Sequence, residues 1–150
     1  MSLSNIGRYH QWVGGQARTL LAELTDEHFT KDLGAPIGSV RDKVVHILEA
    51  LETMKAFLTN DWEAARANVE SFALMKPDTL LEYWQKADHF LATKLQGPLS
   101  GSVTIQRGNN SAFVMSLGDF YLQYVLHTVY HRGQLNYCLK VLGKTCYLFL

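Results

Sequence analysis

At 150 residues, with 47% hydrophobic and 19% charged residues, the chain has the size and composition of one folded domain, which excludes intrinsic disorder. Lysine plus arginine and aspartate plus glutamate both number 14, so the formal net charge is zero and no basic field attracts nucleic acid. No stretch of the sequence approaches the roughly 18 uninterrupted apolar residues of a membrane span.

The two cysteines, Cys138 and Cys146, lie near the C-terminus and form no Cys-x-x-Cys pair. Two are too few for the disulfide framework of a small secreted protein, so we expect a reducing compartment. Residues 1–16 include Arg8 and His10 and lack the apolar core of a signal peptide. The sequence therefore predicts a soluble, cytoplasmic protein.

Four segments place apolar residues at every third or fourth position, the spacing that gives a helix one apolar face. The first spans residues 6–24, after a candidate cap at Ser4. Residues 25–38 are rich in turn-forming residues and predict a loop. The second helix is expected to open with Ser39-x-x-Asp42, which is close to a capping box.

The third helix is expected after Pro77, where Thr79-x-x-Glu82 forms a capping box. Residues 62–72 carry a weaker helical pattern, which leaves a short extra helix and a loop both open. Over residues 101–115 the apolar period changes to two on either side of a group of turn residues. This change predicts a short hairpin.

The last helix is expected to begin at Ser116-x-x-Asp119 and to run to Leu142, where Gly143 supplies the left-handed residue that commonly ends a helix. The sequence contains no internal repeat and no low-complexity segment. It predicts an all-α fold, namely a four-helix bundle with a short hairpin or irregular segment before the last helix, in a single domain over residues 1–150.

The most informative pattern in the last helix is a pair of histidines, His127 and His131, at positions i and i+4. This spacing brings both imidazoles to one face of a helix, where they can converge on one ion at about 2.0–2.1 Å each. At roughly 100° per residue, that face also carries many of the apolar residues of the helix. A histidine on such a face is more often a hydrogen-bonded core residue than a ligand, and the pair alone leaves both interpretations open.

A zinc-type catalytic site takes three protein ligands, so a third ligand is expected from a neighbouring helix. His46 is the best candidate, because it lies at the edge of the apolar stripe of the second helix. His28 falls in the predicted loop. We interpret His10 and His89 as surface or boundary residues, because neither has a second histidine nearby in the sequence.

Two motifs occur together in this chain. They are SVRDKVVHIL over residues 39–48 and His127-x-x-x-His131-Arg132-Gly133-Gln134 in the last helix. With the order of elements, they make the chain resemble the DinB-like (damage-inducible) proteins, whose relatives include bacterial thiol-dependent S-transferases and a thiol-dependent maleylpyruvate isomerase. The resemblance implies a four-helix bundle, commonly a homodimer, with a three-histidine site for nickel, zinc or a similar divalent ion. The resemblance also implies that the metal ligands are His46, His127 and His131.

The chain departs from the family pattern at Gln123, where members often have another histidine one turn before the pair. This departure leaves the three ligands intact and puts in doubt any acid or base role of the missing imidazole. Arg132 and Gln134 are candidates to contact an anionic thiol cofactor, but we interpret Arg132 as structural, paired with a neighbouring carboxylate. We expect two glutamates near His46 to be solvated and two tyrosines of the last helix to pack in the core or an interface: Glu49, Glu52, Tyr124 and Tyr130.

Two functional classes follow. The first is an enzyme that uses the three-histidine metal site, as a thiol S-transferase or a hydrolase of a small-molecule substrate, with a low-molecular-weight thiol as a further cofactor of the transferase. The alternative is a metal-binding stress or interaction protein without turnover. The sequence contains no convincing Ser-His-Asp set and no nucleotide motif, so it identifies no catalytic residue beyond the ligands.

A homodimer is also expected, because the last helix is apolar nearly all round. Away from the histidine face it still carries Leu122, Val125, Leu126, Val129, Tyr130 and Tyr137. A four-helix bundle has no central helix, so this second face needs cover from another chain. The alternative is that the hairpin and residues 60–76 cover it within one chain.

Overall fold

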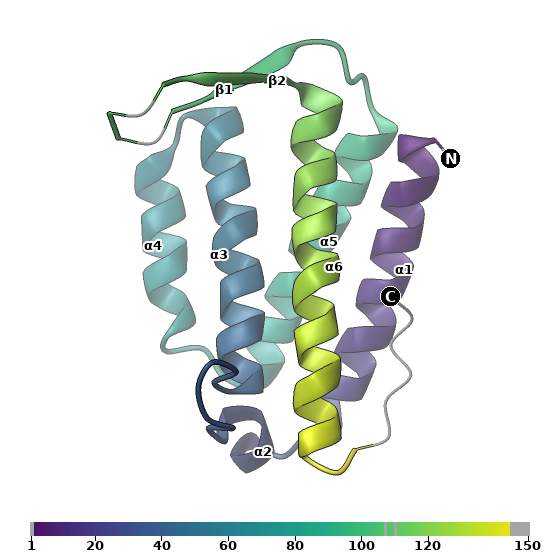
Figure 1. Cartoon of the computed structure of the whole chain (residues 1–150), viewed down its shortest axis with the longest axis vertical. Helices are drawn as coiled ribbons and strands as arrows, with labels where there is room; N and C mark the ends of the chain where they lie inside the picture. Colours follow the sequence, from purple (N-terminus) through teal and green to yellow (C-terminus); the bar gives the residue numbers. More distant parts are fainter. Residues whose placement is uncertain (1, 107, 110, 145–150) are drawn as a thin grey trace.

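The fold is mainly helical in the computed structural model, which describes residues 2–106, 108–109 and 111–144 (Figure 1). In these residues the chain forms six helices and one two-stranded hairpin, which confirms the predicted all-α class and helical bundle. The elements are α1 (Leu3–Ala22), α2 (Asp26–Thr30), α3 (Val40–Thr59), α4 (Trp62–Phe72), α5 (Pro77–Gln96), β1 (Ser102–Ile105), β2 (Phe113–Ser116) and α6 (Leu117–Val141).

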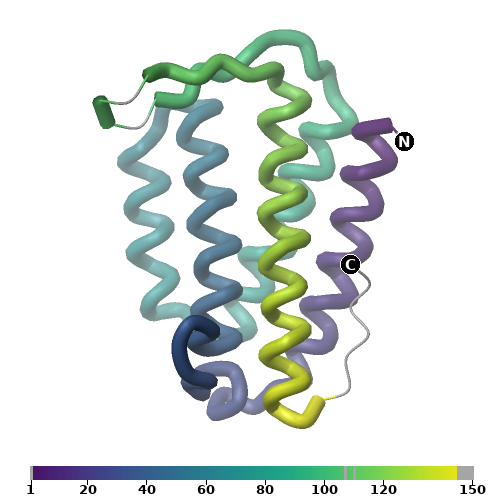
Figure 2. Tube along the Cα trace, viewed as in Figure 1, coloured from purple at the N-terminus to yellow at the C-terminus, as the bar shows by residue number. Residues whose placement is uncertain are grey.

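The four long helices α1, α3, α5 and α6 make the bundle. Helix α1 packs mainly on α5, and α3 packs on α6 (Figure 2). The short α4 packs beside α3 and widens that side of the molecule. Figure 1 shows α3 and α6 running in opposite directions, so that residues far apart in sequence lie side by side.

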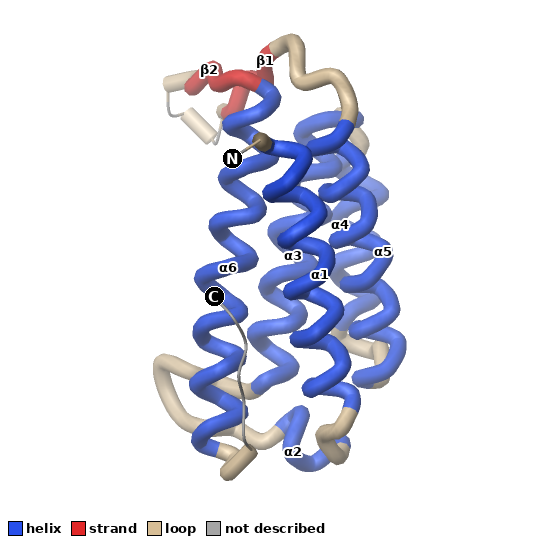
Figure 3. Tube along the Cα trace, turned by 90° about the vertical axis from the view of Figure 1, so that its right-hand side faces the viewer, coloured by secondary structure: helices blue, strands red, loops and turns tan. Residues whose placement is uncertain are grey.

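The hairpin crosses one end of the bundle (Figure 3). Its strands pair antiparallel, with Val103 opposite Met115, and β2 leads directly into α6. This confirms the hairpin expected from the change of apolar period. Helix α4 likewise settles the open question over residues 62–72 in favour of a helix.

The N-termini of α3 and α6 are capped as the sequence predicted. Ser39 and Asp42 form a complete capping box, and the Ser116 side chain accepts a hydrogen bond from the backbone N–H of Asp119. The start of α5 was predicted wrongly. Its N-cap is Lys76, and Pro77 occupies the first turn, where its fixed φ suits a helix and its missing N–H costs nothing.

Two smaller differences concern the first third of the chain. Helix α1 begins one turn earlier than expected, with Ser2 rather than Ser4 as its N-cap. The predicted loop over 25–38 contains the short α2, because the Thr25 side chain accepts from the backbone N–H of His28 and Phe29 is fully buried. These differences leave the bundle itself unchanged.

The core lies between the long helices and is built from their apolar faces. Its largest buried apolar side chains are Trp84, Phe29, Phe72, Phe120, Leu21, Ile47, Leu48, Leu51, Met54, Leu80 and Leu91. None of the helices in the described residues is both long enough and apolar enough to cross a membrane.

Candidate metal centre

Two of the predicted ligands lie one above the other on α6. The Nε2 atoms of His127 and His131 are 3.1 Å apart, and their ring centroids are separated by 4.4 Å. His131 is buried, and His127 is partly exposed. The i, i+4 spacing has therefore placed both imidazoles where one ion could contact both.

The third predicted ligand comes from α3. The ring centroid of His46 lies 4.5 Å from that of His131 and 5.2 Å from that of His127. One potential ligand nitrogen from each histidine lies within 4.8 Å of the other two. The structure thus brings together all three residues that the sequence nominated, at the place where α3 packs against α6.

A hydrogen bond fixes which nitrogen His131 offers. The Nδ1 atom of His131 lies 2.7 Å from the side-chain oxygen of Gln134, three residues along the same helix. An amide oxygen can only accept, so Nδ1 carries the proton and donates it. The lone pair of the neutral ring is then on Nε2, which faces His127.

Burial also keeps the α6 imidazoles neutral. Desolvation, together with the neighbouring His131 and His46, lowers the pKa of His127 to about 4. Desolvation likewise lowers the pKa of His131; its bond to Gln134 acts in the opposite sense, while His46 and Lys43 add to the lowering. Neutral imidazole is the form that coordinates a metal.

The donor set fits a divalent transition ion. Two nitrogens bound at about 2.0–2.1 Å to one tetrahedral ion lie roughly 3.3–3.4 Å apart. The Nε2 atoms of His127 and His131 are 3.1 Å apart, close to that separation. The His46 side chain is 51% exposed and therefore has room to adjust its rotamer toward them. Three imidazoles are ligands that suit zinc, nickel or copper rather than magnesium or calcium.

An open cavity of about 410 Å³ adjoins the histidines. Its lining comes from α3 and α6 and consists of His46, Glu49, Ala50, Thr53, Gln123, Tyr124 and His127. The Glu49 carboxylate is 42% exposed and lies 3.6 Å from Nδ1 of His46, so it contributes negative charge beside the ligand. Gln123, the position where the chain departs from the family pattern, lines this cavity with its amide.

The comparison with known protein families agrees with this geometry. The sequence matches the DinB family over residues 1–149. The chain belongs to the DinB family. No curated protein and no solved structure matches it. The family assignment confirms the resemblance carried by the two histidine motifs, and it leaves the reaction to be argued from the site.

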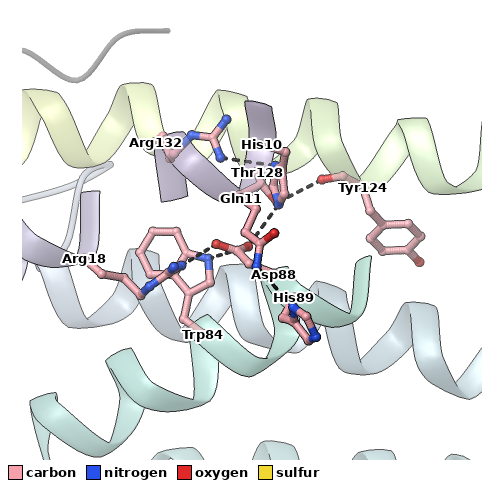
Figure 4. A network of polar contacts seen from close by, with 9 residues as sticks. All are labelled: His10, Gln11, Arg18, Trp84, Asp88, His89, Tyr124, Thr128 and Arg132. Atoms are coloured by element: carbon pink, nitrogen blue, oxygen red, sulfur yellow. Dashed lines mark hydrogen bonds and ion pairs between the residues drawn. The ribbon is translucent and has the colours of Figure 1, made fainter. Parts of the chain in front are cut away.

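A second polar cluster of this DinB-family chain was missed from the sequence (Figure 4). His10, interpreted above as a surface or boundary residue, is only 1% exposed. Its Nε2 donates to Asp88 Oδ1 at 3.0 Å, and its Nδ1 accepts from the Arg132 guanidinium at 3.3 Å. His10 is therefore a satisfied core histidine between α1, α5 and α6.

The carboxylate of Asp88 is the centre of this cluster. It is fully buried and also accepts hydrogen bonds from the Trp84 indole at 3.0 Å and from Arg18. Arg132 is structural, as interpreted, although its hydrogen-bond partner is His10 and not a carboxylate. Burial lowers the pKa of the Arg132 guanidinium, and the nearby charge of Asp88 opposes that lowering.

The remaining predictions for polar residues were mixed. His89 is exposed, as expected, and its Nδ1 accepts a hydrogen bond from the side-chain amide of Gln11 at 3.2 Å. Glu52 was expected to be solvated, yet it is 2% exposed. Its carboxylate accepts from Tyr83 and Asn68 at 2.8 Å each and pairs with Lys55, which is why burial is tolerated. Tyr124 is buried and Tyr130 is exposed.

Proposed function

We propose that this DinB-family protein binds one divalent ion, nickel or zinc, through His46, His127 and His131 and uses it to catalyse transfer of a small thiol. The observation that carries the proposal is the convergence of three imidazoles from two helices beside an open cavity. In the described part of the chain the group holds three histidines and no carboxylate or cysteine. A three-ligand set is typical of catalytic centres, which keep one position for a reactant.

A bound divalent ion lowers the pKa of a thiol or water that it contacts, which makes the sulfur or oxygen nucleophilic near neutral pH. The chain's own residues would then position the reactants. Gln134 holds His131 in its ligating tautomer. The cavity between α3 and α6 gives an electrophilic small molecule access from solvent. A hydrolase would use the same residues with water in place of the thiol.

The second candidate function is a metal-binding stress or interaction protein without turnover. The specific observation in its favour is that the ligands come from α3 and α6, which pack against each other, so an ion would tie the two helices together. The two candidates differ in whether an external thiol can reach the ion.

Cobalt-substituted protein tests the proposal, because cobalt(II) reports a bound sulfur through a new charge-transfer absorption. We expect one ion per chain, a thiol-dependent spectral change, and transfer of the thiol to 1-chloro-2,4-dinitrobenzene. In that reaction a carbon–sulfur bond forms, chloride leaves and the thiol proton is released. His131→Ala should abolish all three, while the exposed His89→Ala should abolish none. If no thiol changes the spectrum of the metal-loaded protein, the result supports the non-catalytic candidate.

A further inference from the structure

A second hollow lies between α3 and α4, next to the cavity beside the histidines. That hollow has a volume of about 190 Å³ and is lined by Thr53, Trp62, Ala65, Arg66 and Val69. Thr53 lines both hollows, so they meet at this residue. We call the combined surface from His46 past Ala50 and Thr53 to Arg66 the α3 trough.

Small side chains form the floor of the α3 trough. His46, Ala50 and Thr53 are spaced i, i+4 and i+7, which places them along one face of α3. The Thr53 hydroxyl donates to the backbone oxygen of Glu49 at 2.9 Å and is thereby held against its own helix. Seven residues of helix span about 10 Å, so the trough leads roughly that far from the imidazole of His46 before it reaches α4.

The far end of the trough carries an aromatic ring and a cation. Trp62 is 44% exposed, and its ring is held edge to face against Phe57 at 4.9 Å. Arg66 is exposed beside it on α4. Glu63 and Glu70 stand three residues before and four after Arg66, yet in the described residues neither makes an ion pair with it.

An exposed arginine is ordinarily just solvated. This one differs because it lines a hollow that shares Thr53 with the metal-ligand cavity, and because its two nearest helical carboxylates leave its guanidinium free for an external anion. A guanidinium presents paired N–H donors that match a carboxylate, and an adjoining tryptophan face suits an apolar connecting chain.

We propose that the α3 trough binds an extended thiol that also carries a carboxylate, with its sulfur at the three histidines and its carboxylate on Arg66. The position of the sulfur at the histidines rests on the proposed function, whereas the carboxylate site at Arg66 does not. The separation of the two ends, at least about 10 Å, selects thiols in which several atoms lie between the sulfur and the carboxylate. A short thiol acid cannot reach both.

The experiment compares 8-mercaptooctanoate with the neutral 8-mercaptooctanol and with the short 3-mercaptopropionate. Affinity is measured by calorimetry on zinc-loaded protein. The sulfur end is followed by cobalt absorption, and the far end by the NMR signal of the Trp62 indole N–H, assigned with Trp62→Phe. We expect the long acid to bind about five- to tenfold more tightly than the alcohol, the range of a favourable partly exposed charge pair.

Arg66→Gln should remove the preference for the acid while leaving the affinity for the alcohol unchanged. Arg8→Gln, at an exposed arginine on α1, should leave the preference intact. Thr53→Phe should weaken both long thiols by blocking the trough, and should leave 3-mercaptopropionate binding as in the parent. Both substitutions in the trough are at residues with solvent access, and circular dichroism checks their folding.

The outcomes separate the two proposals. Equal affinity of the long acid and alcohol in the parent overturns the trough inference, even if both perturb the cobalt spectrum. An Arg66-dependent shift of the Trp62 signal by the acid, without any cobalt change, supports the trough as a carboxylate site and overturns thiol activation. Failure of the long acid to bind overturns the trough inference, and thiol activation is overturned only if none of the three thiols changes the cobalt spectrum.

Discussion

Gln134 determines which nitrogen His131 presents, so its removal is expected to weaken the metal centre without removing a ligand. Gln134→Leu leaves Nδ1 of His131 without its acceptor at 2.7 Å and frees the ring to rotate or change tautomer. We expect zinc affinity to fall about ten- to hundredfold, measured by competition with a chromophoric chelator. Gln134→Glu, which restores an acceptor, should recover the affinity, and Gln85→Leu at an exposed position should have no effect.

The lowered pKa of His127 predicts how the protein responds to acid. In the metal-free folded protein this pKa is about 4, whereas an unfolded chain has the ordinary histidine value of about 6.5. Between these values the unfolded chain binds more protons, so the free energy of unfolding should fall as pH drops through the window and level off below it. The lowered pKa of His131 acts in the same direction.

Urea titrations of the metal-free protein across this window measure the effect. His127→Gln should make stability depend less steeply on pH, and an unchanged dependence would contradict the assignment. In the loaded protein, protons compete with the metal for the same nitrogens, so metal content should be lost over the same range.

At the scale of helices, Glu52 connects three elements. From α3 it accepts hydrogen bonds from Asn68 on α4 and Tyr83 on α5. Burial raises the pKa of Tyr83, and the hydrogen bond to Glu52 and the charge of Glu52 raise it further. Glu52→Ala leaves two donors and the Lys55 ammonium without their partner, and the expected loss of stability is about 3 kcal/mol or more.

Hydrogen exchange followed through α4 tests this role. We expect faster exchange of α4 amides in Glu52→Ala than in Glu49→Ala, whose carboxylate is 42% exposed. Equal protection of α4 in both variants would show that Arg41, which donates to the backbone oxygens of Phe72, Ala73 and Met75 at its end, holds the helix alone.

How far the sequence could predict these elements depends on the range of the interactions involved. Helix faces, the Ser39 and Ser116 caps and the i, i+4 histidines are local patterns, and the structure shows each of them. The partners of His10 lie 78 and 122 residues away, and those of Glu52 up to 31 residues away. Burial of such residues is set by helix packing, which periodicity in one segment does not determine.

For the whole molecule, the second face of α6 remains a candidate dimer interface. Leu126, Tyr130 and Tyr137 are 59%, 64% and 53% exposed. Val125 on the same face is buried, so the chain covers this face in part. Helix α4 lies on α3 and the hairpin lies at the end where α6 begins, and these three residues stay exposed in the described structure. We therefore still expect a homodimer in solution.

Sedimentation equilibrium at tens of micromolar protein tests this prediction. Leu126→Glu should give a monomer that keeps its metal, because Leu126 is on the exposed side of α6 and His131 is buried on the other. Ala67→Glu, at an exposed position of α4, should leave the dimer intact. A parent protein that sediments as a monomer contradicts the prediction.

The buried cluster around Asp88 has a consequence for the alignment of the bundle. An apolar interface tolerates a shift of one helix along another by one turn. After the shift one leucine takes the place of another, and little buried apolar contact is lost. The bonds from His10 to Asp88 and from Arg132 to His10 do not tolerate such a shift, because a slide of α1 by about 5.4 Å would leave the buried Arg132 guanidinium without His10 and the buried Asp88 carboxylate with only its bond from Trp84 on α5. The cluster therefore fixes the axial register of α1 against α5 and α6.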